Sequence, residues 1–116
     1  MLYVMDDELG RIDICELLEF DVVFLRYLLS NESKVTNNPK IQARADRLAA
    51  ELKSGGECEL AWADVFLISS LLLNESVATN NLKTEEKADC LLSKFEAAAK
   101  NIITTVGQGQ CADTNR

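Results

Sequence analysis

The chain of 116 residues contains no histidine, a single proline and a single tryptophan. Without histidine it lacks the commonest general base and the commonest transition-metal ligand. Catalytic schemes that pair a serine or cysteine with histidine are therefore excluded. No apolar run approaches the roughly 20 residues of a membrane span, and the acidic start Met1–Glu8 differs from the basic start of a signal peptide. We therefore expect a cytoplasmic protein that does not bind membranes.

Cysteine is present but sparsely spaced, at Cys15, Cys58, Cys90 and Cys111. No two of them form the closely spaced pair that is typical of a structural zinc site. Since no secretion signal precedes them, disulfides are not expected either. We expect the first three to be buried free thiols, and we expect no cofactor.

The charge is acidic, with 19 acidic and 12 basic residues and a net charge of −7. Such a field repels nucleic-acid phosphates, so direct nucleic-acid binding is not expected. The charge is also uneven, because residues 21–53 carry four acids and six bases whereas residues 54–96 carry eight acids and three bases. This balance favours a protein partner, and one of basic character.

An internal duplication is the strongest signal in the sequence. Residues 15–53 align with residues 58–96 without a gap and are identical at 17 of 39 positions. Cys15-Glu16-Leu17 matches Cys58-Glu59-Leu60, and Asp21 matches Asp64. The chain therefore consists of two copies of one unit, here called repeat 1 (15–53) and repeat 2 (58–96).

Each repeat has the apolar spacing of a helical hairpin. The first helix of each is predicted near 14–31 and 57–74, with Asp13–Glu16 and Ser54–Glu57 as capping boxes. Asn38 and Pro39 begin the second helix of repeat 1, and its counterpart in repeat 2 runs to about residue 106. We predict one all-α domain over 1–106, an up-down-up-down four-helix bundle with a short N-terminal extended arm or small β-hairpin, followed by a disordered tail over 107–116.

The outward faces of the first helices differ between the repeats. On repeat 1 this face is predicted to be mostly polar, but the duplication replaces Glu19 by Trp62, Val23 by Phe66 and Ser30 by Leu73. Exposed aromatic residues usually mark a contact surface. The predicted partner-binding residues are Trp62, Phe66, Ser69 and Leu73. The alternative is an asymmetric fold in which the N-terminal arm covers this helix.

Asp21 and Asp64 occupy equivalent positions on the inward faces, where a lone carboxylate is unfavourable. The preferred interpretation is that arginine, lysine or hydroxyl groups of a neighbouring helix bind each of them. The alternative is that the two bind a divalent cation, with Glu85, Glu86 and Asp89 nearby in a hydrolase. A basic ridge of Lys40, Arg44 and Arg47, echoed by Lys83, Lys87 and Lys94, is interpreted as a solvated face.

The segment Asn-Glu-Ser-x-x-Thr-Asn-Asn-x-Lys occurs in both repeats with seven of ten positions identical. Helix capping explains part of this likeness. Alternatively, two loops at the same end of a bundle form a polar rim that contacts a partner or a small ligand. The residues of this loop rim are Asn31, Glu32, Thr36, Asn37, Asn74, Glu75, Thr79 and Asn80.

From these features we predict a non-enzymatic protein-binding module, an adaptor or inhibitor, that forms a homodimer. Its binding surface would be the aromatic stripe, with the acidic residues as a rim. Two alternatives stay open: a divalent-metal-dependent all-α hydrolase that uses the carboxylate cluster, and a small-ligand sensor that uses the twin asparagine-rich loops.

Overall fold

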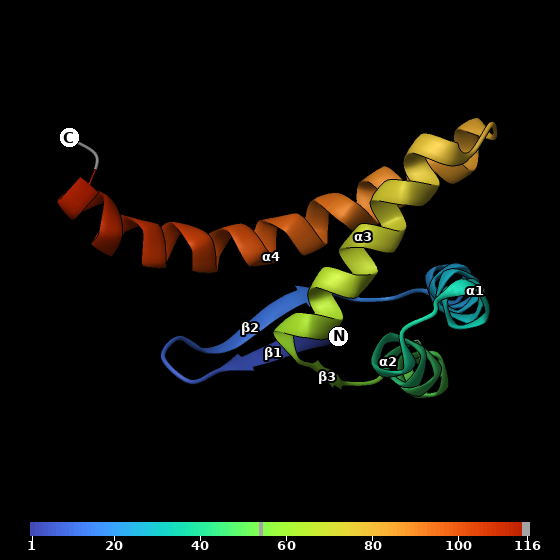
Figure 1. Cartoon of the computed structure of the whole chain (residues 1–116), viewed down its shortest axis with the longest axis horizontal. Helices are drawn as coiled ribbons and strands as arrows, with labels where there is room; N and C mark the ends of the chain where they lie inside the picture. The colour runs from blue at the N-terminus through green and yellow to red at the C-terminus, as the bar shows by residue number, and fades with distance from the viewer. Residues whose placement is uncertain (54, 115–116) are drawn as a thin grey trace.

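Within the part of the chain that the structure describes, four helices and a small three-stranded sheet make up the fold (Figure 1). The computed structural model describes residues 1–53 and 55–114. The elements are β1 (Leu2–Asp6), β2 (Gly10–Cys15), α1 (Glu19–Val35), α2 (Pro39–Glu51), β3 (Cys58–Leu60), α3 (Trp62–Ala78) and α4 (Leu82–Thr114). The fold is therefore α+β, and the prediction of an all-α four-helix bundle is wrong. Of the two predicted forms of the N-terminus, the β-hairpin is the one observed. No helix in the described part of the chain has the length and apolar character of a membrane span.

The sheet joins the two repeats through the N-terminal strand. Its order is β2-β1-β3, with β2 antiparallel and β3 parallel to the central β1. Leu2 of β1 is paired with Cys15 on one side and with Cys58 on the other. Since Cys15 and Cys58 are equivalent in the duplication and their strands run in opposite directions, the two repeats lie in an approximately two-fold arrangement about β1.

The first helix of each repeat begins later than predicted, because the residues before it are extended. Cys58–Leu60 form β3, and Cys15 ends β2. Asp13 lies in β2 and accepts a bond from Arg11 Nε at 2.6 Å, so the predicted Asp13–Glu16 capping box does not form. Ser54, of the second predicted box, lies outside the described residues. The observed caps are Leu18 and Ala61.

Each repeat then forms the predicted helical hairpin, but the two hairpins are not parallel. In Figure 1 α1 and α2 are seen nearly end-on, whereas α3 and α4 run across the view. An up-down-up-down bundle would align all four axes, so this part of the prediction fails as well. The last helix, α4, extends to Thr114, past the helix end that the sequence predicts near residue 106. No proline, the residue that most strongly ends a helix, occurs in this segment.

One hydrophobic core lies between the sheet and the helices. Leu2 and Val4 of β1 are 2% and 1% exposed, and they pack into the same cluster as the inner faces of the helices. The largest fully buried side chains of the helices are Leu25, Leu29, Leu48, Val65, Ile68, Leu72, Leu91 and Phe95. Cys15 is buried and burial raises the pKa of its thiol to about 11, Cys58 is half-buried, and Cys90, which was expected to be buried, is exposed on α4.

The two faces of β1 give a test of its role in this core. Replacement of Val4 by alanine should lower the free energy of unfolding by about 2 kcal/mol, because it removes methyl groups from a closely packed site. The neighbouring Met5 is 51% exposed on the opposite face, so Met5→Ala should change stability by less than about 0.5 kcal/mol. Urea unfolding measures both. If Val4→Ala lowers the free energy of unfolding as little as Met5→Ala does, β1 does not contribute to the core.

Candidate functional site

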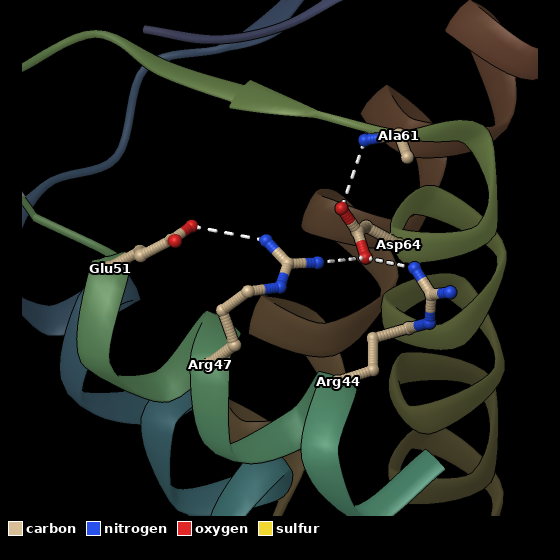
Figure 2. Close-up of polar contacts among 5 residues, drawn as sticks. All are labelled: Arg44, Arg47, Glu51, Ala61 and Asp64. Atoms are coloured by element: carbon tan, nitrogen blue, oxygen red, sulfur yellow. Dashed lines mark hydrogen bonds and ion pairs between the residues drawn. The ribbon is translucent and has the colours of Figure 1, made fainter. Parts of the chain in front are cut away.

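A buried carboxylate at the start of α3 joins the two repeats. Figure 2 shows Asp64 between α3 and α2, with Arg44 and Arg47 reaching it from α2. Arg44 Nη1 and Arg47 Nη2 both donate to Asp64 Oδ1, at 2.6 and 2.8 Å. The backbone N–H of Ala61 donates to Oδ2 at 2.9 Å. The side chain of Asp64 is only 1% exposed, and it therefore caps its own helix while binding two cations from the other repeat.

Asp21 makes the equivalent contacts from repeat 1. The backbone N–H of Leu18 donates to its Oδ2 at 3.0 Å, and Lys87 Nζ of α4 donates to its Oδ1 at 2.7 Å. Lys87 is the residue that the duplication aligns with Arg44. Each aspartate thus binds the same basic position of the opposite repeat, so the ion pairs are reciprocal. Arg47 has no basic counterpart, because Cys90 occupies its position in repeat 2.

Both carboxylates are stabilised in their charged form. Burial by itself raises the pKa of Asp64, but the Ala61 N–H and the two guanidinium groups outweigh burial and hold this pKa below the usual value. For Asp21, too, burial raises the pKa, and the Lys87 ammonium and the Leu18 N–H lower it further than burial raises it. Both aspartates are therefore ionised at neutral pH and take part in ion pairs.

These contacts change the interpretation of two sequence features. Arg44, Arg47 and Lys87, which were expected to form a solvated face, instead bind buried carboxylates. The aspartates are paired with basic groups of a neighbouring helix, as the preferred interpretation expected. Both oxygens of each carboxylate already accept hydrogen bonds. Within the residues whose side chains are described, no group of three cysteine or carboxylate side chains is arranged to hold a metal ion.

The predicted partner-binding residues lie along one face of α3, but not all are exposed. Trp62 is partly buried against the core, and its Nε1 donates to Asp6 Oδ2 at 3.2 Å across to the end of β1. Phe66 lies beside it, with ring centroids 6.4 Å apart, and is 55% exposed. Leu73 is 52% exposed, and Ser69 lies between these two with partial exposure. The exposed part of this surface is thus centred on Phe66 and Leu73 rather than on Trp62.

A groove runs between this face of α3 and α4. Its volume is about 690 Å³, and Phe66 and Ser69 line it from α3. From α4 it is lined by Ser93, Glu96, Ala97, Ala99 and Lys100. Three of these α4 side chains, Ser93, Ala97 and Ala99, are small, whereas Glu96 and Lys100 are long and charged. Phe66, Ser69 and this part of α4, together with the exposed Leu73 one turn farther along the same face of α3, are called the α3 groove below.

A second apolar surface, which the sequence analysis missed, lies on α1. Phe20 is 81% exposed, Val23 66% and Tyr27 57%. They recur at a spacing of three and four residues, so they share the face of α1 opposite the buried Leu25 and Leu29. The helical periodicity identifies this face, but we predicted it to be mostly polar because it also carries Glu19, Arg26 and Ser30.

The twin loops owe their likeness to capping. The Asn38 side chain accepts from the N–H groups of Lys40 and Ile41, and Asn81 does the same for Lys83 and Thr84. Thr36 and Thr79 each accept from the N–H two residues on, at 3.2 Å in both repeats. The predicted rim residues Asn37 and Asn80 are exposed, and Glu32 and Glu75 supply the carbonyls that end α1 and α3. Because the two hairpins are not parallel, their loops do not emerge from one end of a bundle. Asn31 and Asn74, the remaining rim residues, are exposed on the last turns of α1 and α3.

Comparison of the chain with protein-family models, with curated proteins and with solved structures found no match.

The reciprocal ion pairs predict a specific loss of stability. Asp64→Asn should lower the free energy of unfolding by about 3 kcal/mol at pH 7, because it leaves two guanidinium groups without their carboxylate. Asp21→Asn should cost less, since a single lysine binds this residue, and Asp46→Asn on the exposed side of α2 serves as the control. Because the folded-state pKa values of Asp21 and Asp64 are lowered, their contribution is present above about pH 4 and is lost as the pH falls through those values. Urea unfolding at several pH values measures this. If wild type and Asp64→Asn lose equal stability on acidification, the role given to this carboxylate is wrong.

Substitutions at neighbouring asparagines distinguish a capping role of the loops from a role as a rim that contacts a partner. Asn38→Ala and Asn81→Ala should each lower the free energy of unfolding by about 1 kcal/mol, because each removes the acceptor for two N–H groups at a helix start. Asn37→Ala and Asn80→Ala, one residue earlier, should leave thermal unfolding nearly unchanged. A large loss of stability at Asn37 or Asn80 would contradict the capping explanation.

Proposed function

We propose that this chain is a non-enzymatic protein-binding module whose partner docks in the α3 groove. The observation that carries the proposal is the pair of exposed side chains Phe66 and Leu73 beside a groove with small residues on its far side. Large apolar side chains in such a setting supply most of the binding energy in many protein interfaces. A partner helix could insert an apolar side chain between Phe66 and Ala97.

The charge of repeat 2 favours a basic partner. Residues 54–96 carry eight acidic and three basic residues, whereas the groove lining itself holds one charge of each sign, Glu96 and Lys100. An acidic surface speeds the approach of a basic partner and disfavours acidic ones. The proposed partner is therefore a protein segment with apolar anchors flanked by lysine or arginine.

A binding role also agrees with the chemistry of the chain. It has no histidine, and its two buried carboxylates are engaged in ion pairs between the repeats. These groups support the architecture instead of supplying an acid and a base. The proposal extends to an adaptor or an inhibitor, which act by occupying a partner's surface.

Substitutions in the groove test this proposal. The full chain, immobilised, is used to capture proteins from its native host, and each captured protein is quantified against two variants, Phe66→Asp and Leu73→Asp. A true partner should bind wild type and be reduced at least about tenfold by either substitution, because each places a charge at an apolar contact.

A control at a distant site distinguishes groove binding from nonspecific adhesion. Leu9 is 44% exposed at the turn between β1 and β2, so Leu9→Asp changes the surface charge equally but should retain the partner. If every captured protein binds all of these variants alike, the α3 groove is not the binding surface.

A further inference from the structure

The outer face of α1 is an apolar surface that the proposed function does not use. In Figure 1 α1 lies at the right margin of the molecule with α2 below it, and no other described element covers it on the far side. By their exposure and helical spacing, Phe20, Val23 and Tyr27, each more than half exposed, share the outer face of α1, and Phe24, partly buried, lies at its edge. Exposure of these side chains to water is unfavourable. A surface of this kind is therefore a candidate contact site for a partner.

Charges beside this face point to the occupant. Glu19 and Arg26 lie seven residues apart, almost two helical turns, so both flank the apolar residues on the same side of α1. One is acidic and the other basic, and Val23 lies between them in the sequence. When a second α1 packs antiparallel across a two-fold axis at Val23, the acidic position of one copy meets the basic position of the other. The same operation places Phe20 against Tyr27 of the partner copy.

We propose that the chain forms a two-fold symmetric dimer in which the outer faces of two α1 helices pack antiparallel about Val23. Such an isologous contact must be self-complementary, and this face meets that requirement in both its apolar and its charged positions. Glu19 of each copy pairs with Arg26 of the other, twice per dimer. Arg26 Nη2 already donates to the carbonyl of Leu52 at 2.5 Å, which fixes the side chain, and a guanidinium carries further N–H groups that can bind a carboxylate.

The size of the surface sets the expected affinity. Three large side chains per copy, together with the edge of Phe24, would bury roughly 900 Å² in total. Stable interfaces bury about 1,200–2,000 Å², so the dimer should be of modest strength, with a dissociation constant in the micromolar range. The dimer contact lies on α1, whereas the α3 groove of each copy lies between α3 and α4. This inference therefore does not depend on the proposed function.

Sedimentation of the full chain over a concentration range, from about 1 to 500 µM, tests the dimer. Wild type should shift from monomer to dimer across this range. Phe20→Glu should weaken association at least about tenfold, because it places two carboxylates in the apolar contact. The matched control is Phe66→Glu, which changes an exposed phenylalanine on α3 and should leave association unchanged. A wild type that is monomeric throughout, or a dimer that is weakened by Phe66→Glu and not by Phe20→Glu, would overturn the proposal.

A charge exchange tests the antiparallel arrangement itself. Glu19→Lys places lysine against Arg26 of the partner copy, and Arg26→Glu places glutamate against Glu19, so each variant alone should associate at least about tenfold more weakly than wild type. A mixture of the two variants restores both opposite-charge pairs in the heterodimer, which should form with nearly wild-type affinity. Circular dichroism shows whether each variant folds.

Absence of a preferred heterodimer between two folded variants would contradict this arrangement. Should Arg26→Glu not fold, because it loses its bond to Leu52, the comparison of Phe20→Glu with Phe66→Glu decides the proposal.

Discussion

In each repeat, a buried aspartate at the third position of a helix caps that helix and also binds the other repeat. Asp21 and Asp64 each bind the backbone at the start of their own helix and a basic side chain of the other repeat. A buried carboxylate is unfavourable unless it is paired, so neither repeat can bury its aspartate without the other. The sheet adds a second link, because the N-terminal strand contributes Leu2 and Val4 to the core and pairs with strands from both sides.

The two repeats share their turns and helix caps because they are copies of one unit. They differ on the outer faces of α1 and α3, where the sequences of the copies differ. The positions that match, such as Thr36 with Thr79 and Asn38 with Asn81, form the same turn and cap twice. The outer faces of α1 and α3 differ: apolar side chains lie near the start of α1 and farther along α3. The duplication therefore conserves the inner contacts of the unit, while its outer faces provide two different apolar surfaces.

The sequence predicts the duplication, the two helical hairpins and the pairing of the aspartates, since each depends on local spacing or on the unfavourable burial of a charge. It does not predict that Cys15 ends a strand or that Cys58-Glu59-Leu60 form one, because an apolar segment next to a helix fits either state and strand pairing with β1 is a long-range contact. The same late start of α3 makes Trp62 its first residue, from which the indole reaches Asp6 and becomes half-buried. The basic partners of the aspartates lie 17, 20 and 66 residues away. Their pairing depends on how the two hairpins are oriented relative to each other. The periodicity of a single helix does not predict that orientation.

Double-mutant cycles at the two equivalent ion pairs test the central claim most directly. Alanine substitutions at Asp64 and Arg44, and separately at Asp21 and Lys87, give a coupling free energy for each pair. Reciprocal buried pairs predict coupling of about 1 kcal/mol or more in both cycles, well above that of the exposed pair Arg11–Asp13, whose attraction is screened by solvent. Additive effects in both cycles would mean that the aspartates act only as helix caps, and would contradict the view that they lock the two repeats together.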